Sequence, residues 1–293
     1  MRIHVGTRKS RLALAQTQLA IESLKKFLPN LETQIVSIST KGDQDFQTPL
    51  YQMPTTGVFI KEIEQALIDH TIDLAVHSLK DVSSISDDRL MLLPFTVFED
   101  KRDALISKDH QSLTELKKGA RIATSSIRRM ACIHQVRPDI EFVSIRGNID
   151  TRLEKFKKMD LDGIVLAMAG LKRLSKDDLV DEILDPSILV PACGQGTLAV
   201  QIRKEDRDLY AGLPKRTISQ REVEIEREFL SLCNTGCHDP IGCMIQFDND
   251  HILAYACLGT SMEDISVIRE VLPMEKESQT ASILYERLQE KKR

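Results

Sequence analysis

Apolar positions in the first 100 residues recur with the periods of both strands and helices. A short apolar run at residues 3–6 precedes a helical pattern that starts near Ser10. The expected stripe of that helix is Leu14, Ile21, Leu24 and Leu28, broken only by Thr17. Residues 34–39, 73–78 and 90–94 predict strands, and Phe59, Ile63, Ala66 and Leu67 predict a second helix. This alternation predicts a mostly parallel or mixed sheet flanked by helices.

The same alternation restarts beyond residue 101. Strand-like runs occupy residues 104–107, 121–123, 141–145 and 163–167. Helices are predicted at residues 126–136 and along Ile149, Leu153 and Phe156. This second α/β unit ends near Pro191, and residues 197–202 are expected to return to the first unit.

The pattern changes after Pro214. A charged helix at residues 219–232 is followed by a Gly-rich loop at 234–242, strands at 244–247 and 253–258, and a C-terminal helix. The charged tail, residues 275–293, predicts a solvated surface helix. We therefore expect three domains: residues 1–97 with 197–214, residues 102–191, and a smaller α+β domain at 218–293.

Composition restricts the kind of ligand. The 293 residues include 40 Lys+Arg and 44 Asp+Glu, a formal charge of −4. A mildly acidic chain is a poor candidate for broad nucleic-acid binding, which depends on phosphate neutralisation. A local basic site for a small anion fits better. The N-terminus lacks signal-peptide features, and the uncharged run at 186–202 is interrupted by Pro and Gly, so we expect a cytoplasmic protein that does not span a membrane.

The six cysteines should then be mostly reduced. Cys132 lies in a helical pattern and Cys257 in a strand pattern. Both are expected to pack as small buried hydrophobes.

Four arginines lie where strand-like runs give way to helices. They are Arg128, Arg129, Arg146 and Arg152. Arginine stays charged and its planar fork of donors fits carboxylate or phosphate. Strand-to-helix turns face ligand crevices in α/β proteins, and helix N-termini there favour anions. Any one arginine could simply pair with a local acid, but the set predicts a site for a ligand with several anionic groups.

Two further turns carry candidate residues. Arg8 and Ser10 begin the first helix, where Ser10 could equally be a helix cap, and the P-loop spacing is absent. Lys80 and Asp81 follow the strand at 73–78. In an arginine-lined crevice Asp81 would stay ionised and could stabilise positive charge on a substrate. His77 is expected to be structural.

The loop at residues 233–243 allows two chemical interpretations. Cys233, Cys237, His238 and Cys243 could bind a metal, although their spacing lacks the paired Cys-x-x-Cys signature. Alternatively Cys237 alone is an exposed nucleophile whose thiolate is favoured by nearby cations. An inert loop cysteine is the third possibility, and local sequence does not decide among them.

Taken together, the ordered motifs resemble the porphobilinogen deaminase family. They are Gly6-Thr-Arg-Lys-Ser-Arg-Leu-Ala-Leu-Ala-Gln16, Thr40-Lys-Gly-Asp43, Ala75-Val-His-Ser-Leu-Lys-Asp-Val82, Thr124-Ser-Ser-Ile-Arg-Arg129, Ile145-Arg-Gly-Asn148, Gly194-Gln-Gly196, Glu226-Arg-Glu-Phe-Leu230 and Gly236-Cys-His-Asp-Pro-Ile-Gly242. The resemblance runs from about Ile3 to Gly242. It implies two α/β domains like the halves of a periplasmic binding protein, and a third domain carrying the loop cysteine.

The resemblance also implies a reaction and a cofactor. Four porphobilinogen molecules would be joined head to tail with release of ammonia, and linear hydroxymethylbilane would then be hydrolysed off. A dipyrromethane cofactor would be attached by a thioether to Cys237, and a monomer is implied. Asp81, with Lys80 and Arg8, would be catalytic. Cofactor and chain would be held by Ser10, Lys80, Asp81, Thr124, Ser126, Arg128, Arg129, Arg146, Arg152 and Arg173.

This sequence departs from the family pattern in three places. Thr56 replaces a lysine in the segment 54–57. Asn234-Thr235 precedes Gly236 where a second glycine is usual. The segment 195–201 ends in Gln201 in place of a glutamate. The competing hypotheses are a non-catalytic binding protein for a polyanionic small molecule, and a zinc-stabilised interaction module.

Overall fold

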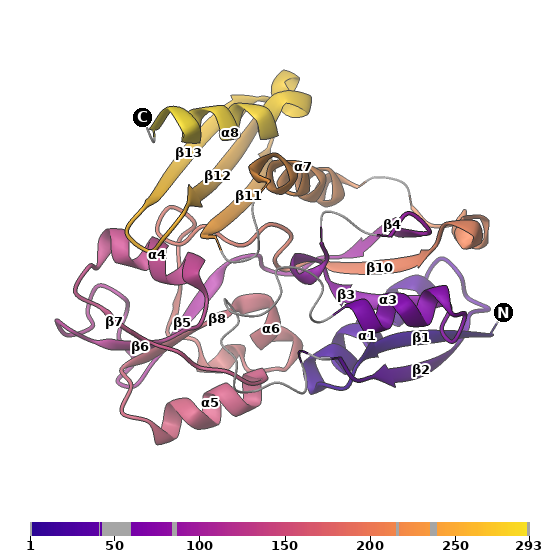
Figure 1. Cartoon of the computed structure of the whole chain (residues 1–293), viewed down its shortest axis with the longest axis horizontal. Coiled ribbons are helices and arrows are strands. Elements are labelled where there is room, and N and C mark those ends of the chain that lie inside the picture. The colour runs from indigo at the N-terminus through magenta and orange to yellow at the C-terminus, as the bar shows by residue number, and fades with distance from the viewer. Residues whose placement is uncertain are drawn as a thin grey trace.

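Three sheets organise the chain in the computed structural model, which describes residues 2–40, 42, 60–83, 87–214, 217–234 and 239–291 (Figure 1). The first α/β unit contains β1 (Arg2–Arg8), α1 (Arg11–Lys25), β2 (Glu32–Ile38), α3 (Lys61–Ile68), β3 (Leu74–Ser78), the 3-10 turn η2 (Leu79–Asp81), β4 (Leu90–Val97), β10 (Leu198–Arg203) and the 3-10 segment η4 (Lys204–Tyr210). The second contains β5 (Asp103–Ser107), β6 (Arg121–Ala123), α4 (Ile127–Val136), β7 (Glu141–Val143), α5 (Ile149–Lys158), β8 (Gly163–Ala167), α6 (Met168–Arg173), η3 (Asp177–Leu179) and β9 (Glu182–Ile183).

The two five-stranded sheets share one arrangement. The first has the order β2-β1-β3-β10-β4 and the second β7-β6-β8-β5-β9. In each sheet, one strand is antiparallel to the other four. This strand is β10 in the first sheet and β5 in the second. Both of these strands follow a segment that crosses from the other unit, at residues 98–102 and 184–197. The predicted mixed α/β class, and the return of residues 197–202 to the first unit, are therefore confirmed.

Side-chain caps start the helices close to where the sequence predicts them. Ser10 accepts a hydrogen bond from the N–H of Ala13 at 3.2 Å. Ser126 and Asn148 cap α4 and α5 in the same way, and Thr217 caps a later helix, α7 (Ile218–Cys233). The stripe expected for α1 is wrong at Leu14, which is exposed. Thr17 is fully buried instead, because its hydroxyl donates to the Ala13 carbonyl at 2.8 Å and leaves no unpaired polar group.

A small C-terminal unit completes the fold. It contains α7 (Ile218–Cys233), β11 (Ile241–Asp248), β12 (His251–Gly259), β13 (Ile265–Pro273), the 3-10 segment η5 (Met274–Gln279) and α8 (Thr280–Lys291). The three strands form an antiparallel meander, and α7 and α8 lie over it (Figure 1). The α+β class is confirmed, but β13 is absent from the sequence prediction.

The expectation of a solvated tail helix is wrong. In α8, Leu284 and Leu288 are fully buried with Ala281 and Thr280, and they join the core of the C-terminal sheet. One narrow stripe at spacings of three and four residues is enough to bury a helix that is otherwise charged.

The C-terminal unit also shares a core with the second unit. Tyr255, Cys257 and Ile265 pack in one cluster with Leu105 and Cys132. The sulfur atoms of Cys132 and Cys257 lie 3.9 Å apart, and both residues are buried, which confirms their packing role. None of the described helices is long and apolar enough to cross a membrane.

Candidate active site

Asp81 ends the turn η2, directly after the central strand β3. Asp81 is exposed to solvent, and its carboxylate forms no hydrogen bond or ion pair with the part of the chain that the structure describes. It nevertheless lies in a cationic neighbourhood, since its charge acts on the pKa values of Lys80, Arg152 and His77. A carboxylate that is accessible and close to several cations can accept hydrogen bonds from a ligand.

Arg128 and Arg129 start α4 and share one buried acid. Arg128 Nη2 lies 2.9 Å from Asp103 Oδ2, and Arg129 Nη2 lies 2.7 Å from Asp103 Oδ1. Both guanidinium groups also donate to backbone carbonyls, Arg128 to Val190 and Arg129 to Val165 at 2.8 Å. The interpretation of pairing with an acid thus holds for these two arginines, and the acid is 25 or more residues away in sequence.

Asp103 is fully buried at the start of β5. Burial raises the pKa of its carboxyl group, but Arg128, Arg129 and Lys80 outweigh this effect and hold the pKa at about 2. One carboxylate therefore faces three cations, and the group keeps an excess of positive charge.

Lys80 is solvent-exposed over part of its surface, yet protein atoms surround its ammonium group densely. This crowding lowers its pKa to about 8, with Asp81 acting in the opposite direction and Arg129 adding to the decrease. The ammonium donates to Gln195 Oε1 at 3.1 Å. At pH 7 the group is still charged.

The second strand-to-helix turn supplies Arg146 and Arg152. Arg152 Nε donates to the Gly147 carbonyl at 2.6 Å. Burial, together with Arg129, Arg146 and Arg8, lowers the pKa of Arg152 to about 10. Arg8 of the first unit is therefore within electrostatic range of Arg152 in the second unit.

Arg173 stands at the end of α6 and contacts a crossing segment. Its guanidinium donates to the Gly196 carbonyl, and burial lowers its pKa to about 10. Glu99 acts against that decrease. No electrostatic coupling between Arg173 and the other predicted arginines is resolved.

The predicted hydroxyl residues have structural partners. Ser10 and Ser126 are helix caps, so the capping interpretation of Ser10 is confirmed. Thr124 is buried, and its hydroxyl accepts from the N–H of Ser126 at 3.2 Å. His77 is buried and bonded to Gln201 at 3.0 Å, which agrees with a structural histidine.

Cys237, His238 and Thr56 lie outside the described residues. The two flanks of the cysteine loop are described. Asn234 caps α7 in the left-handed conformation, with φ of 45°. Beyond the loop, β11 starts against the second unit, since a Cβ on Gly242 would lie 2.6 Å from the Pro191 carbonyl oxygen and 3.1 Å from Arg128 Cδ. Cys233 and Cys243 are buried in the C-terminal core.

Two residues that position the site were missed from sequence. Asp103 could have been found as an acidic residue at the start of an otherwise apolar strand. Gln195 could have been found as a polar residue between two glycines. The site as a whole combines six cations with the carboxylates of Asp81 and Asp103. Pairwise effects on pKa link these cations into one group: Arg8, Lys80, Arg128, Arg129, Arg146 and Arg152. That excess of positive charge fits a ligand carrying several carboxylates.

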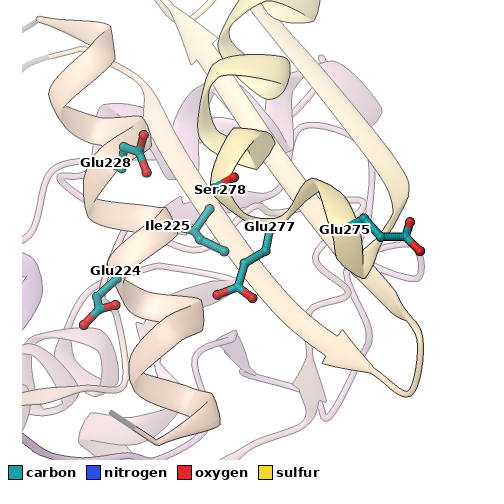
Figure 2. Close-up of a pocket in the computed structure, with 6 residues that line it drawn as sticks. All are labelled: Glu224, Ile225, Glu228, Glu275, Glu277 and Ser278. Carbon is teal, nitrogen blue, oxygen red and sulfur yellow. The ribbon is translucent and has the colours of Figure 1, made fainter. Parts of the chain in front are cut away.

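An acidic cavity elsewhere does not fit such a ligand. It has a volume of about 510 Å³ and lies between α7 and η5, lined by Glu224, Ile225, Glu228, Glu275, Glu277 and Ser278 (Figure 2). Its carboxylates would repel an anion. It contains none of the predicted site residues.

The fold and site define a protein of two mixed α/β units with a cluster of cations drawn from both, a charge arrangement suited to a small polyanion. A family model described as "Porphobilinogen deaminase, dipyromethane cofactor binding domain" matches residues 3–211. A curated porphobilinogen deaminase of Oceanobacillus iheyensis is 40% identical over 290 residues, covering 97% of this chain and 94% of the relative. That of Bacillus subtilis is 46% identical over 242 residues, covering 82% and 77%. The chain belongs to the porphobilinogen deaminase family, as the motifs predicted.

A solved structure of a probable amino-acid ABC transporter extracellular-binding protein from Bacillus subtilis is also similar. It is 13% identical, with a TM-score of 0.43, and the match covers 72% of this chain and 88% of that chain.

Proposed function

We propose that the chain joins four porphobilinogen molecules head to tail, releasing ammonia each time, and then releases linear hydroxymethylbilane by hydrolysis. Membership of the porphobilinogen deaminase family supports this reaction. The observation that carries it in the structure is Asp81, an accessible carboxylate with no partner among the described residues, set among cations of both α/β units.

Asp81 would stabilise positive charge that develops on the substrate during ammonia loss. A fixed anion near that charge lowers the barrier most when water is scarce around it. Lys80 and Arg8 would complete the catalytic group by holding substrate carboxylates beside Asp81.

The residues present also fit a dipyrromethane cofactor. Its acetate and propionate groups require several cations, and the six coupled cationic side chains exceed the two carboxylates nearby. Arg128, Arg129, Arg146 and Arg152 would hold these groups, with Arg173, Ser10, Thr124 and Ser126 at the margins. The cofactor would supply the pyrrole end on which the chain grows.

We propose a thioether from Cys237 to that cofactor. Support comes from the flank of its loop, since Gly242 lies against Arg128. Cys237 precedes Gly242 by five residues, so it lies within about 16–18 Å of that contact.

Intact mass of the purified protein tests the proposal. We expect wild type to carry an adduct of two pyrrole units and Cys237→Ser to carry none. A matched Cys132→Ser variant changes a buried cysteine and should keep the adduct. An unmodified wild type that neither consumes porphobilinogen nor gains mass when incubated with it contradicts the proposal.

The alternative of a non-catalytic polyanion-binding protein makes a different prediction in the same assay. It expects reversible binding of a polycarboxylate, with no adduct and no release of ammonia. The zinc-module hypothesis expects bound metal in elemental analysis.

We further propose that the chain works as a cytoplasmic monomer of three domains: residues 1–97 with 197–214, 102–191, and 218–293. The separate sheets support these boundaries. Light scattering tests the monomer, and limited proteolysis tests the boundaries. Because the two crossings are packed against each other, the first cut is expected at the linker near Pro214.

A further inference from the structure

Gln195 is a buried polar residue on the second crossing, and its backbone is held tightly. Its neighbours Gly194 and Gly196 both have positive φ, 72° and 85°. A Cβ on Gly196 would lie 2.5 Å from the carbonyl oxygen of Glu99 on the first crossing. The two crossings therefore pack backbone against backbone here, and only glycine allows that approach. Gln195 itself is 1% exposed.

The side-chain amide of Gln195 makes three hydrogen bonds. Its Oε1 accepts from Lys80 Nζ at 3.1 Å. Its Nε2 donates to the Lys101 carbonyl at 2.8 Å and to Asp103 Oδ1 at 3.0 Å. The orientation of the amide is fixed chemically, because an ammonium can only donate and an ionised carboxylate can only accept.

These partners belong to different units. Lys80 follows β3 of the first sheet. Asp103 begins β5 of the second sheet and forms ion pairs with Arg128 and Arg129. Gln195 thus connects the lysine of one unit with the aspartate–arginine cluster of the other. Among natural side chains of this length, only an amide can accept from a cation and donate to a carboxylate at once.

We propose that Gln195 is a positioning residue for the anion site, one that fixes the Lys80 ammonium relative to Arg128 and Arg129 so that cations of both units face one ligand. The choice of ligand, a polycarboxylate pyrrole chain, rests on the proposed function, but the link between Gln195 and Lys80 does not.

Replacement of Gln195 by glutamate tests directly whether its amide group acts on Lys80. Gln195→Glu keeps the acceptor for Lys80 but removes the donor and adds a negative charge beside Asp103. The charged groups that act on Lys80 are Asp81, Arg129, Asp103 and Arg128. A new carboxylate in contact should raise the titration midpoint of Lys80 by at least one pH unit from its value of about 8.

The measurement is trace acetylation of the full-length protein between pH 6.5 and 10, with Lys80 followed by peptide mass spectrometry. Gln201→Glu is the matched control. It makes the same change at a buried glutamine in β10 that contacts His77 and Glu64, not Lys80, and should leave the Lys80 midpoint unchanged. An unchanged midpoint in folded Gln195→Glu overturns the proposal.

Kinetics give an independent reading. Gln195→Leu removes the acceptor for Lys80, and we expect the KM for porphobilinogen to rise about tenfold to a hundredfold, with a smaller change in kcat. A wild type without activity would reject the proposed function, while the acetylation result would still decide the role of Gln195. A folded Gln195→Leu with wild-type KM overturns it.

Wild type alone keeps the proposal testable if these variants do not fold. In protein labelled with 15N-glutamine, the Gln195 side-chain N–H signals should exchange slowly and titrate with a midpoint near that of Lys80. Gln18, an exposed glutamine bonded to Glu22, is the internal control. Gln195 signals that exchange as fast as those of Gln18 and do not titrate contradict the proposal.

Discussion

The ammonium of Lys101 lies 2.9 Å from the fully buried carboxylate of Glu226. Lys101 is on the first crossing, and Glu226 is on α7 of the C-terminal unit. The same carboxylate accepts from the backbone N–H groups of Gly194 and Ile245 at 2.8 and 3.1 Å. One ion pair therefore joins both crossings to the unit that carries the cysteine loop.

The two partners respond differently to this burial. Burial lowers the pKa of Lys101, but Glu226 and Glu222 together outweigh it and raise the value. Burial raises the pKa of Glu226 despite its partners. We take the pair as ionised, because three donors converge on the Glu226 carboxylate and each favours its charged form.

Lys101→Met should lower the free energy of unfolding by roughly 3–5 kcal/mol, since Glu226 would remain as a buried charge without its cation. Urea denaturation at pH 7 measures the change. The control Lys172→Met removes a partly exposed partner of Glu99 and should cost less than about 1 kcal/mol. Adding Glu226→Gln to Lys101→Met should recover part of the loss; equal stabilities of the single and double variants contradict the explanation.

Asp103→Asn should destabilise the protein by a similar amount, roughly 3–5 kcal/mol, because Arg128 and Arg129 would be left close together and buried without their shared acid. Asp87→Asn is the control, since Asp87 pairs with Arg89 at the surface. That change should cost less than about 1 kcal/mol. If the two variants lose the same free energy of unfolding in the same denaturation assay, burial of the shared acid does not make Asp103 more important than a surface partner.

Asp81→Ala should separate stability from turnover. The Asp81 carboxylate makes no bond within the described chain, so unfolding free energy should change by no more than about 0.5 kcal/mol. Consumption of porphobilinogen should fall at least about a hundredfold, since the fixed anion is lost. Asp88→Ala, at another exposed aspartate, is the control for activity. Near-normal turnover of Asp81→Ala refutes the assigned role.

The sequence predicts much of this fold because most elements carry a local signal. Strands β6 and β8 match their predicted ranges, and the caps Ser126 and Thr217 lie where the helical patterns begin. The strand β13 was missed because it buries few of its residues, so its pattern lacks the alternation of a half-buried strand.

The site was predictable only as a set of cations. Arginines at strand-to-helix turns follow from spacing, and Arg128, Arg129 and Arg152 indeed lie in one electrostatic neighbourhood. Their pairing with Asp103 and the bond from Gln195 to Lys80 join residues far apart in sequence. Such contacts depend on how the two crossings pack, and local patterns carry no information about that.

Leu284→Ala tests the corrected view of α8. The side chain is fully buried in the core of the C-terminal unit, so its truncation should cost roughly 2–5 kcal/mol. Glu290→Ala, on the exposed side of the same helix, should change stability by no more than about 0.5 kcal/mol. Thermal denaturation compares the two. A solvated surface helix would give equally small effects at both positions.

The chain Glu64–Gln201–His77 makes stability depend on pH in a defined direction. Gln201 Nε2 donates to Glu64 at 2.8 Å, so its Oε1 accepts from His77 Nε2. Burial lowers the pKa of His77 to about 4, against the opposing effects of Gln201 and Asp81. The unfolded chain, with an ordinary value near 6.5, binds the proton first as pH falls. The contribution of His77 to the free energy of unfolding is therefore fully present above pH 6.5. It decreases by roughly 3 kcal/mol as the pH falls towards 4.

Gln201→Glu should reverse that behaviour. A carboxylate in contact with the imidazole favours its protonated form, so the pKa of His77 should rise well above 4. NMR titration of the His77 ring measures the pKa, and urea denaturation at pH 7 and pH 5 measures the stability. We expect wild type to lose stability between these pH values and the variant to lose less. His77→Gln should also flatten the dependence, because no titrating ring remains; a wild-type slope in that variant would assign the pH dependence to other groups.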